Sequence, residues 1–268
     1  MSLLSADKIE AFNKRGANVI PGAFGENLVV EGFDFRALPV GTLLRCGDVL
    51  LEMTQIGKEC HSHCEIYKKM GECIMPREGV FARVIEPGSI SVGDEMSIEK
   101  REGHFPWQAA VITLSDKAAA GERKDESGPA IAKRLREASY EVVEEIVIPD
   151  DERVLKQQLI RLCDQRQLDL ILTTGGTGCS ARDITPEATL AIADKNVPGI
   201  AEAMRAESLK ITRHAMISRA ASVIRGKTLI INIPGSPRAC MENMDVFMDT
   251  IPHAMGLLRN EVHDCARK

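Results

Sequence analysis

The spacing of hydrophobic and polar positions changes near residue 103. Between residues 21 and 100 the apolar runs are short, lie between Gly or Pro turns, and contain no helical period longer than about three turns. Residues 49–56 and 80–85 are typical of strands, and residues 5–14 indicate one short helix ahead of them. Short strands separated by regular turns predict a small β-barrel or sandwich.

After residue 108, apolar strands alternate with helical patterns. The run 109–114 is apolar throughout, as in a strand of a parallel sheet that is buried on both faces. Further strands are expected at residues 142–148, 168–172 and 228–233. Helix starts are expected at residues able to cap them, namely Ser127, Asp150 or Asp151, Thr185 and Ser236. This alternation predicts an α/β fold, a three-layer α/β/α sheet that binds ligands at the carboxyl ends of its strands.

A charged segment with one glycine, residues 100–104, separates the two patterns and is the candidate linker. The alternative is a solvated turn within one domain. Because the architecture changes after this segment, we expect two domains, a small β-barrel domain at 1–102 and an α/β domain at 106–268. A chain of 268 residues has room for two domains.

The amino-acid composition limits the classes of partner that the protein is expected to bind. The chain has 34 Lys and Arg against 39 Asp and Glu, a net charge of −5, which argues against general nucleic-acid binding but leaves room for a local basic pocket. No apolar run approaches the ~18 residues of a membrane span, and the first residues show no secretion signal. We therefore expect a cytoplasmic protein without a membrane partner, whose eight cysteines are thiols.

The loops after the predicted strands carry the candidate chemistry; they are residues 115–121, 149–152, 173–187 and 234–237. The third begins with Thr173, Thr174, Gly175, Gly176, Thr177 and Gly178. Its glycines allow backbone N–H groups to turn toward an oxyanion, and its threonine hydroxyls add donors. The Gly-Lys-Ser/Thr ending of a Walker loop is absent, so this loop predicts phosphate binding of another kind.

Two aspartates accompany this loop. Asp183 follows it within a few residues, and Asp150 comes from a neighbouring strand end. Two carboxylates beside a phosphate cradle suit Mg²⁺, which takes one or two carboxylates together with substrate phosphates. Each aspartate has a structural alternative, because Asp150 can cap a helix and Asp183 can be a turn residue paired with Arg182. The spacing leaves both alternatives open.

Residues 173–178, 182–188 and 234–237, supported by 113–116 and 148–150, resemble the molybdopterin-binding family of molybdenum-cofactor synthesis. The similarity is greatest to its molybdopterin adenylyltransferases, the bacterial Mog proteins related to the G domain of gephyrin, and it extends from about residue 107 to the C-terminus. The resemblance implies transfer of AMP from Mg-ATP to the terminal phosphate of molybdopterin, with release of pyrophosphate.

Carried over residue by residue, the resemblance makes Asp150 and Asp183 the catalytic aspartates and the Mg²⁺ ligands, and gives the loop 173–178 the nucleotide phosphates. It implies that the pterin or its phosphate is faced by Ser115, Asp116, Ser218, Arg219, Pro234, Gly235 and Ser236. It also implies self-association, as a trimer, and partners among other proteins of molybdenum-cofactor synthesis or sulfuration.

The first domain has its own resemblance. Residues 21–28, 38–41, 54–60, 82–84 and 92–94 are similar to a MOSC domain, the β-barrel of molybdenum-cofactor sulfurases. In that family a single cysteine is proposed to carry sulfur as a persulfide, and Cys60 is the matching position. Lys58, His61 and His63 would lower the pKa of its thiol. The strand and Gly-Asp-x-His stretch that usually open the family are absent, so we expect the chain to begin inside this fold.

Other interpretations compete with these. Cys60, Cys64 and Cys73 with the neighbouring histidines offer ligands for zinc or iron, although their spacing is not that of a standard zinc knuckle. One alternative for the second domain is a non-catalytic molybdopterin carrier. Another is a molybdate-insertion enzyme, a class of enzyme that would need further domains around this fold. The two aspartates favour the adenylyltransferase, because a carrier needs phosphate donors rather than metal-binding carboxylates.

Overall fold

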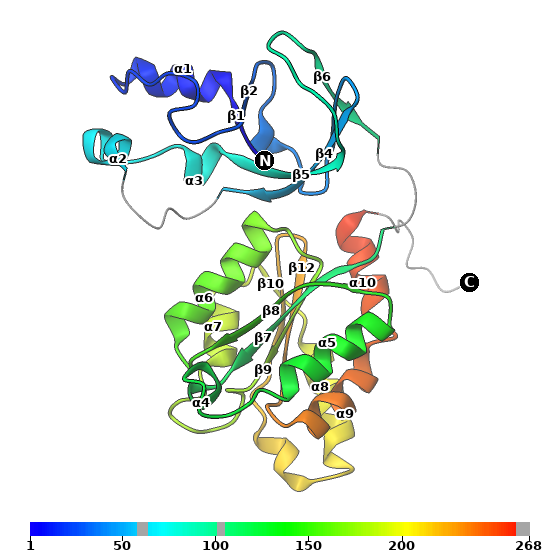
Figure 1. Ribbon diagram of the computed structural model, residues 1–268. Coiled ribbons are helices and arrows are strands. Elements are labelled where there is room, and N and C mark those ends of the chain that lie inside the picture. The colour runs from blue at the N-terminus through cyan, green and yellow to red at the C-terminus, as the bar shows by residue number, and fades with distance from the viewer. Residues whose placement is uncertain (58–63, 101–104, 261–268) are drawn as a thin grey trace. The chain divides into compact units, whose positions relative to one another are not determined.

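The computed structural model describes residues 1–57, 64–100 and 105–260, and the chain forms two compact units, 1–104 and 105–268 (Figure 1). Cys60, Lys58, His61 and His63, on which the sulfur-carrier hypothesis depends, lie outside the described residues, as does most of the expected linker.

The first unit contains a six-stranded sheet and is rich in strands, as the sequence predicts. Across the sheet the strands are β2 (Leu28–Val30), β1 (Ser2–Ser5), β5 (Val80–Glu86), β4 (Val49–Ile56), β3 (Leu43–Cys46) and β6 (Met96–Glu99). β1 and β2 are parallel, and the other neighbours are antiparallel. Among the described residues no pairing joins β2 to β6, so the pairings seen do not close the sheet into a ring.

Short helices complete this unit. They are α1 (Ala6–Lys14), α2 (Glu65–Met70), α3 (Met75–Glu78) and the 3-10 turn η1 (Phe35–Ala37). Successive residues of a strand face opposite sides of the sheet, and β1 shows the result. Leu3 packs into a core with Phe35 and Leu51, whereas Leu4 packs with Ile9 and Phe12 of α1.

The second unit is built on a second six-stranded sheet. Its strands lie in the order β10 (Lys195–Asn196), β11 (Ser222–Arg225), β12 (Thr228–Ile233), β9 (Leu170–Thr174), β7 (Gln108–Leu114) and β8 (Glu141–Ile148). β12, β9, β7 and β8 are parallel to one another, whereas β11 is antiparallel to both β10 and β12. The carboxyl ends of four strands therefore meet at one edge of the sheet.

Helices cover both faces of this sheet (Figure 1). They are α4 (Asp116–Ala119), α5 (Ser127–Glu137), α6 (Glu152–Ile160) with the π-helical turn η2 (Arg161–Gln165), α7 (Thr185–Ala191), α8 (Pro198–Leu209), the 3-10 turn η3 (Arg213–Ile217), α9 (Pro237–Phe247) and α10 (Ile251–Arg259). Val111 of β7 packs toward α5, α8, α9 and α10, and Ile112 packs toward α6 and α7. The predicted three-layer α/β/α fold is confirmed.

One strand boundary bears on the site. The hydrophobic run predicts a strand at residues 168–172, but β9 covers Leu170–Thr174. Thr173 and Thr174 pair in register with Asn232 and Ile233 of β12, so both threonines belong to the sheet rather than to the loop. The loop predicted to bind phosphate is therefore shorter than the sequence motif.

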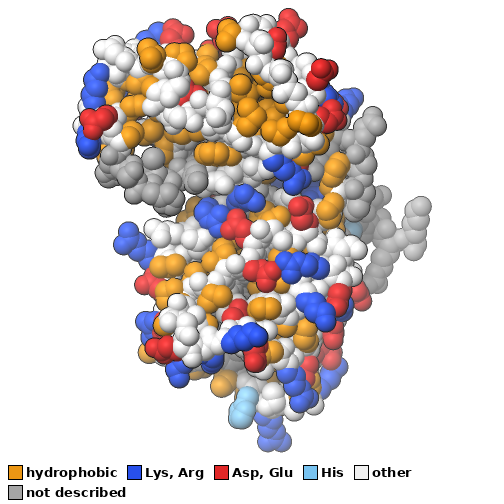
Figure 2. All heavy atoms as spheres, viewed as in Figure 1, with side chains coloured by type: hydrophobic (Ala, Val, Ile, Leu, Met, Phe, Trp, Pro, Cys, Tyr) orange, Lys and Arg blue, Asp and Glu red, His pale blue; other side chains and the backbone are white. Residues whose placement is uncertain are grey.

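No helix in the described part of the chain is long and apolar enough to cross a membrane. Lys and Arg side chains are interspersed with Asp and Glu on the visible face of the second unit (Figure 2). This face therefore lacks the one-sign field that general nucleic-acid binding requires.

Candidate active site

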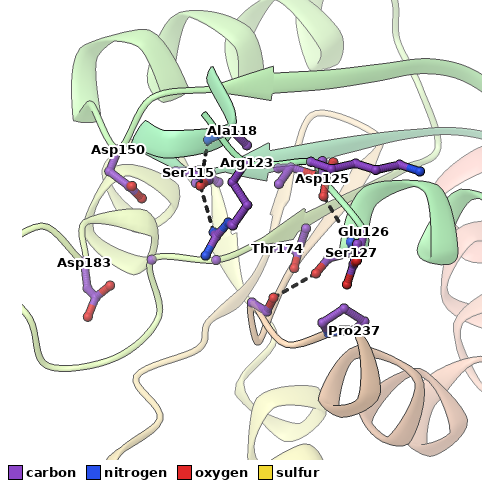
Figure 3. A pocket seen from close by; sticks show the side chains of 16 residues that line it. Ser115, Ala118, Arg123, Asp125, Glu126, Ser127, Asp150, Thr174, Asp183 and Pro237 are labelled. Carbon is purple, nitrogen blue, oxygen red and sulfur yellow. Dashed lines mark hydrogen bonds between the residues drawn. The ribbon is translucent and has the colours of Figure 1, made fainter. Parts of the chain in front are cut away.

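A cleft of about 550 Å³ lies at the sheet edge where β7, β8, β9 and β12 end (Figure 3). Sixteen residues line it: Thr113, Leu114, Ser115, Ala118, Arg123, Lys124, Asp125, Glu126, Ser127, Asp150, Thr174, Gly175, Gly176, Asp183, Gly235 and Pro237. Asp150 and Asp183 lie toward one end, and Asp125, Ser127 and Pro237 lie toward the other. All four loops singled out in the sequence thus contribute to one cavity.

Two glycines shape the floor of the cleft. Gly175 and Gly176 have φ values of 98° and 63°, a conformation that side chains rarely adopt. A Cβ at Gly175 would lie 2.4 Å from the carbonyl oxygen of Leu114, and one at Gly176 would lie 2.4 Å from Oγ1 of Thr185. The backbone turns closely against β7 and α7 here, which only glycine permits.

The threonines of the motif face different surroundings. The Thr173 hydroxyl is fully buried and accepts a hydrogen bond from the Asn232 side chain at 2.9 Å, so the structure does not bring it to the cleft. The Thr174 hydroxyl lines the cleft but donates to the Pro234 carbonyl at 2.7 Å. Thr177 and Gly178 line a second, smaller pocket. The residues predicted for phosphate binding are therefore divided, with Thr174, Gly175 and Gly176 at the cleft.

The carboxylate of Asp150 is available to the cleft because Asp151, and not Asp150, caps α6. The backbone N–H of Val154 donates to Oδ1 of Asp151 at 3.0 Å, which resolves the alternative left open by the sequence. Oδ2 of Asp150 accepts a hydrogen bond from the Asp116 N–H at 3.0 Å, and its Oδ1 accepts none from any described residue. Burial raises the pKa of Asp150, and the negative charges of Asp116 and Asp183 add to the rise.

Asp183 also presents one oxygen to the cleft. Its Oδ2 accepts a hydrogen bond from the Ser180 N–H at 2.8 Å, while Oδ1 has no partner within the described part of the chain. The expected alternative, a pairing with Arg182, is wrong. The Arg182 guanidinium instead contacts both carboxylate oxygens of Asp116 at 2.7 Å. This pairing lowers the pKa of Asp116.

The residues predicted to face the pterin do not form one surface. Ser115 and Gly235 line the large cleft, and Ser218 and Pro234 line the smaller pocket. The Ser115 hydroxyl accepts hydrogen bonds from the Ala118 N–H and the Arg123 guanidinium. Ser236 is exposed where α9 begins and lines neither cavity.

Two residues of this group remain: Asp116, which is paired with Arg182 and lines neither cavity, and Arg219, which points toward the protein backbone. Its guanidinium donates to the carbonyl oxygens of Gly178 at 2.5 Å and Asp183 at 2.6 Å, and it pairs with Glu187. Arg219 therefore joins the glycine loop to the start of α7.

The smaller pocket, of about 260 Å³, opens between the glycine loop, α8, η3 and α9. Besides Thr177, Gly178, Ser218 and Pro234, its lining consists of Met204, Arg205, Ser208, Ile211, Thr212, His214, Ala215, Ile217, Ala239, Glu242 and Asn243. Most of its exposed wall is apolar, in contrast to the polar cleft. The segment 174–178 thus lines one cavity with its first half and the other with its second.

Sequence reasoning missed four cleft residues between β7 and α5, namely Arg123, Lys124, Asp125 and Glu126. Arg123 and Lys124 bring positive charge to the cleft. Oδ1 of Asp125, rather than the predicted Ser127, accepts hydrogen bonds from the first N–H groups of α5. The Ser127 hydroxyl instead donates to the Gly235 carbonyl. The charged run 122–126 was the available signal.

The donor set fits one kind of metal site. Within the described residues no group of three or more His, Cys, Asp or Glu side chains is placed to hold a metal ion. Mg²⁺ needs no such group, because it is usually held by one or two carboxylates together with substrate phosphates and water. Asp150 and Asp183, each with one uncommitted oxygen, supply that number of ligands.

Comparison with known proteins assigns both units. The family model "probable molybdopterin binding domain" matches residues 110–253, and the model "MOSC domain" matches residues 1–97. The chain belongs to the molybdopterin-binding domain family. Both resemblances seen in the sequence are thereby confirmed.

Individual relatives agree with this assignment. A molybdopterin adenylyltransferase from Helicobacter pylori is 41% identical over 150 residues, covering 55% of this chain and 85% of the relative. Gephyrin from Dictyostelium discoideum is 37% identical over 185 residues, covering 65% of this chain and 25% of gephyrin. The crystal structure of the molybdopterin biosynthesis enzyme MoaB from Thermus thermophilus superposes with a TM-score of 0.55 at 41% identity, covering 57% of this chain and 97% of MoaB.

Proposed function

We propose that this chain is a molybdopterin adenylyltransferase that transfers AMP from ATP to the terminal phosphate of molybdopterin and releases pyrophosphate. The observation that carries the proposal is the cleft in which the Gly175–Gly176 turn meets the carboxylates of Asp150 and Asp183. The similarity to enzymes named molybdopterin adenylyltransferase supports it.

The polar cleft receives the nucleotide in this proposal. The backbone N–H of Gly176 faces the phosphates, because the N–H of Gly175 already donates to the Ile233 carbonyl oxygen at 3.3 Å. The cations of Arg123 and Lys124 offset the negative charge of the phosphates. Asp150 and Asp183 hold Mg²⁺, which supplies charge neutralisation at the phosphate oxygens when it is bound. The chain's own residues hold the phosphates in line for the transfer.

The smaller pocket receives the pterin. A pterin is flat and largely unsaturated, and the apolar walls with polar groups such as Ser218 and Asn243 match such a ring. Because the segment 174–178 lines both cavities, a phosphate attached to the bound pterin lies near the nucleotide phosphates. Pro234 lines the smaller pocket and Gly235 lines the cleft.

The reaction needs no covalent intermediate with the protein. A terminal phosphate oxygen of molybdopterin forms a bond to the α-phosphorus of ATP, and the bond from that phosphorus to the β-phosphate bridging oxygen breaks. The bonding electrons leave with pyrophosphate. Catalysis then consists of positioning and of offsetting negative charge, since the reacting groups repel each other.

The decisive experiment incubates the full chain with molybdopterin and Mg-ATP and looks for adenylylated molybdopterin and pyrophosphate by chromatography and mass spectrometry. Formation of both products supports the enzyme. Tight molybdopterin binding without either product would favour the alternative, a non-catalytic carrier.

The remaining expectations from the sequence belong to the same proposal. We propose that the chain self-associates through its second unit as a trimer, and that its MOSC domain handles the sulfur of the cofactor through Cys60, in exchange with other cofactor-synthesis or sulfuration proteins. The exposed apolar side chains of Leu209, at the end of α8, and Met216, in η3, are ones that a second copy would cover. Light scattering at micromolar concentration tests the oligomer. A cytoplasmic location stays a prediction.

A further inference from the structure

Asp116 connects the loops that follow β7 and β8. Its backbone N–H donates to Oδ2 of Asp150 at 3.0 Å, and in return the backbone N–H of Asp150 donates to Oδ1 of Asp116 at 3.0 Å. Two reciprocal hydrogen bonds thus join residues 34 positions apart. They fix both the main chain of Asp150 and the direction of its carboxylate.

Arg182 adds the loop after β9 to this arrangement. Its Nε donates to Oδ2 of Asp116 at 3.1 Å, and its terminal nitrogen lies 2.7 Å from each oxygen of the same carboxylate. Such a two-pronged contact defines orientation as well as distance. Arg182 immediately precedes Asp183, so the ion pair ties the segment that carries Asp183 to the residue that holds Asp150.

The ion pair contributes little to stability. The Arg182 and Asp116 side chains are 63% and 46% exposed, and solvent screens an ion pair at such an exposed position. The ion pair can still have a large effect on the reaction rate through the positions of the groups it holds, because a displacement of about 1 Å at a reacting centre can lower the rate about a hundredfold. A Cβ at Gly176 would lie 3.5 Å from Oδ1 of Asp150, which shows that the held carboxylate turns its uncommitted oxygen toward the glycine loop.

We infer that Asp116 and Arg182 are positioning residues, which set the separation of Asp150 and Asp183 by tying three loops together. This inference rests on the proposed adenylyl transfer and revises the sequence-based expectation that Asp116 faces the pterin. Both oxygens of the Asp116 carboxylate are occupied by Arg182 and Asp150, and neither residue of the ion pair lines either cavity.

The test compares Arg182→Gln, Arg182→Lys, Asp116→Asn and the double variant Arg182→Gln/Asp116→Asn in the full chain. The matched control is Arg225→Gln, because Arg225 forms a similar two-pronged pair with Asp164 away from the site loops. We expect Arg182→Gln to lower kcat by about tenfold to a hundredfold with KM for ATP and molybdopterin changed by less than about threefold, and Arg182→Lys to recover part of kcat. The double variant should be no slower than the slower single variant, because both changes remove one contact.

Two results together would overturn the inference by showing that Arg182 binds substrate. They are a raised KM for ATP in Arg182→Gln and a double variant whose loss of activity is the sum of the losses in the two single variants. Full activity in Arg182→Gln would also overturn it. The wild-type assay separates these results from a failure of the proposed function, since a wild-type chain that forms no product contradicts the function alone.

A second measurement does not depend on activity. Hydrogen–deuterium exchange, read in peptides covering residues 148–151 and 180–183, reports the contacts directly. We expect faster exchange in both segments for Arg182→Gln, partial restoration in Arg182→Lys, and wild-type exchange there for Arg225→Gln. Unchanged exchange in Arg182→Gln would overturn the inference even if the chain proved inactive as an enzyme.

Discussion

The hydroxyl of Ser127 donates a hydrogen bond to the carbonyl oxygen of Gly235 at 2.8 Å, and so joins the start of α5 to the turn that follows β12. The two residues are 108 positions apart and both line the cleft. The contact holds one end of the cavity in place, at the opposite end from Asp150 and Asp183 (Figure 3).

Replacing this hydroxyl should weaken the fold. Ser127 is buried, so Ser127→Ala removes a hydrogen bond without gaining hydration and should lower the free energy of unfolding by about 1 kcal/mol. Ser236→Ala is the matched control, because Ser236 is exposed and its hydroxyl does not cap α9. Urea denaturation of both variants measures the difference, and equal midpoints would contradict the role of the contact.

Asp183→Asn should abolish adenylyl transfer while leaving the fold intact. The change keeps the size of a side chain that lines the cleft and removes its charge. We expect a fall in kcat of at least about a hundredfold and a free energy of unfolding within about 0.5 kcal/mol of wild type. Asp245→Asn, at an exposed residue paired with Arg134, should keep full activity. Full activity of Asp183→Asn would contradict the metal-holding role.

Gly176→Ala should destabilise the chain more than Gly226→Ala. The two glycines have φ values of 63° and 57°, so both substitutions pay about 1–2 kcal/mol for the left-handed backbone. Only Gly176 is crowded, since a Cβ at Gly226 meets no atom within 4 Å. An additional loss of about 1–3 kcal/mol is therefore expected for Gly176→Ala, together with weaker ATP binding. Thermal and urea denaturation with ATP titration check this, and equal losses would be evidence against the close turn.

The burial of Tyr140 should make the free energy of unfolding depend on pH above pH 10. It is 5% exposed, its hydroxyl has no hydrogen-bond partner in the described part of the chain, and burial raises its pKa to about 12. Between pH 10 and 12 the unfolded tyrosine loses its proton before the folded one, so the free energy of unfolding should fall as pH rises, by up to about 2 kcal/mol from this group.

Tyr140→Phe should remove that component of the pH dependence. It should also leave stability at pH 7 unchanged or slightly higher, because phenylalanine keeps the ring without a buried, unpaired hydroxyl. Urea denaturation of both proteins at pH 7, 10 and 11 gives the comparison. Parallel pH profiles would mean that Tyr140 titrates normally.

Cys60 should be the most alkylation-reactive of the eight thiols. Lys58, His61 and His63 are close to it in sequence and favour the thiolate. Cys163 and Cys240 should react slowest, because burial raises the pKa of both thiols, to about 12 for Cys163. Mass-spectrometric mapping after brief iodoacetamide treatment at pH 7 ranks them.

A chelator arm of the same experiment separates the metal alternative. If Cys60, Cys64 and Cys73 share a metal, all three should be protected until it is removed. Labelling of Cys265 or Cys179 ahead of Cys60, with and without chelator, would count against the sulfur-carrier hypothesis.

The sequence predicted those strands and turns whose conformation is determined by a few adjacent residues. The apolar run 109–114 is typical of a buried strand, and consecutive glycines at 175 and 176 indicated a tight turn, because each feature is a property of a few adjacent residues. The sequence also placed Asp150 and Asp183 beside that turn, because parallel strands end at one edge.

Contacts between distant residues were not predictable in this way. A pairing of Arg182 with its neighbour Asp183 was one of the alternatives that the sequence left open, yet Arg182 pairs with Asp116, 66 positions away, where the loop after β7 brings a carboxylate within reach. Likewise the capping of α5 by Asp125 and the burial of Thr173 against Asn232 depend on the register of elements that meet only in the folded sheet.

Within the five residues 174–178, the first three line the cleft and the last two line the smaller pocket. If one substrate shifts this segment when it binds, the space offered to the other substrate of the proposed reaction changes, and the two binding equilibria are then thermodynamically linked. Whatever factor nucleotide binding applies to the affinity for the pterin, pterin binding applies to the affinity for the nucleotide. The coupling would then pass through the short turn that follows Thr174, the last residue of β9.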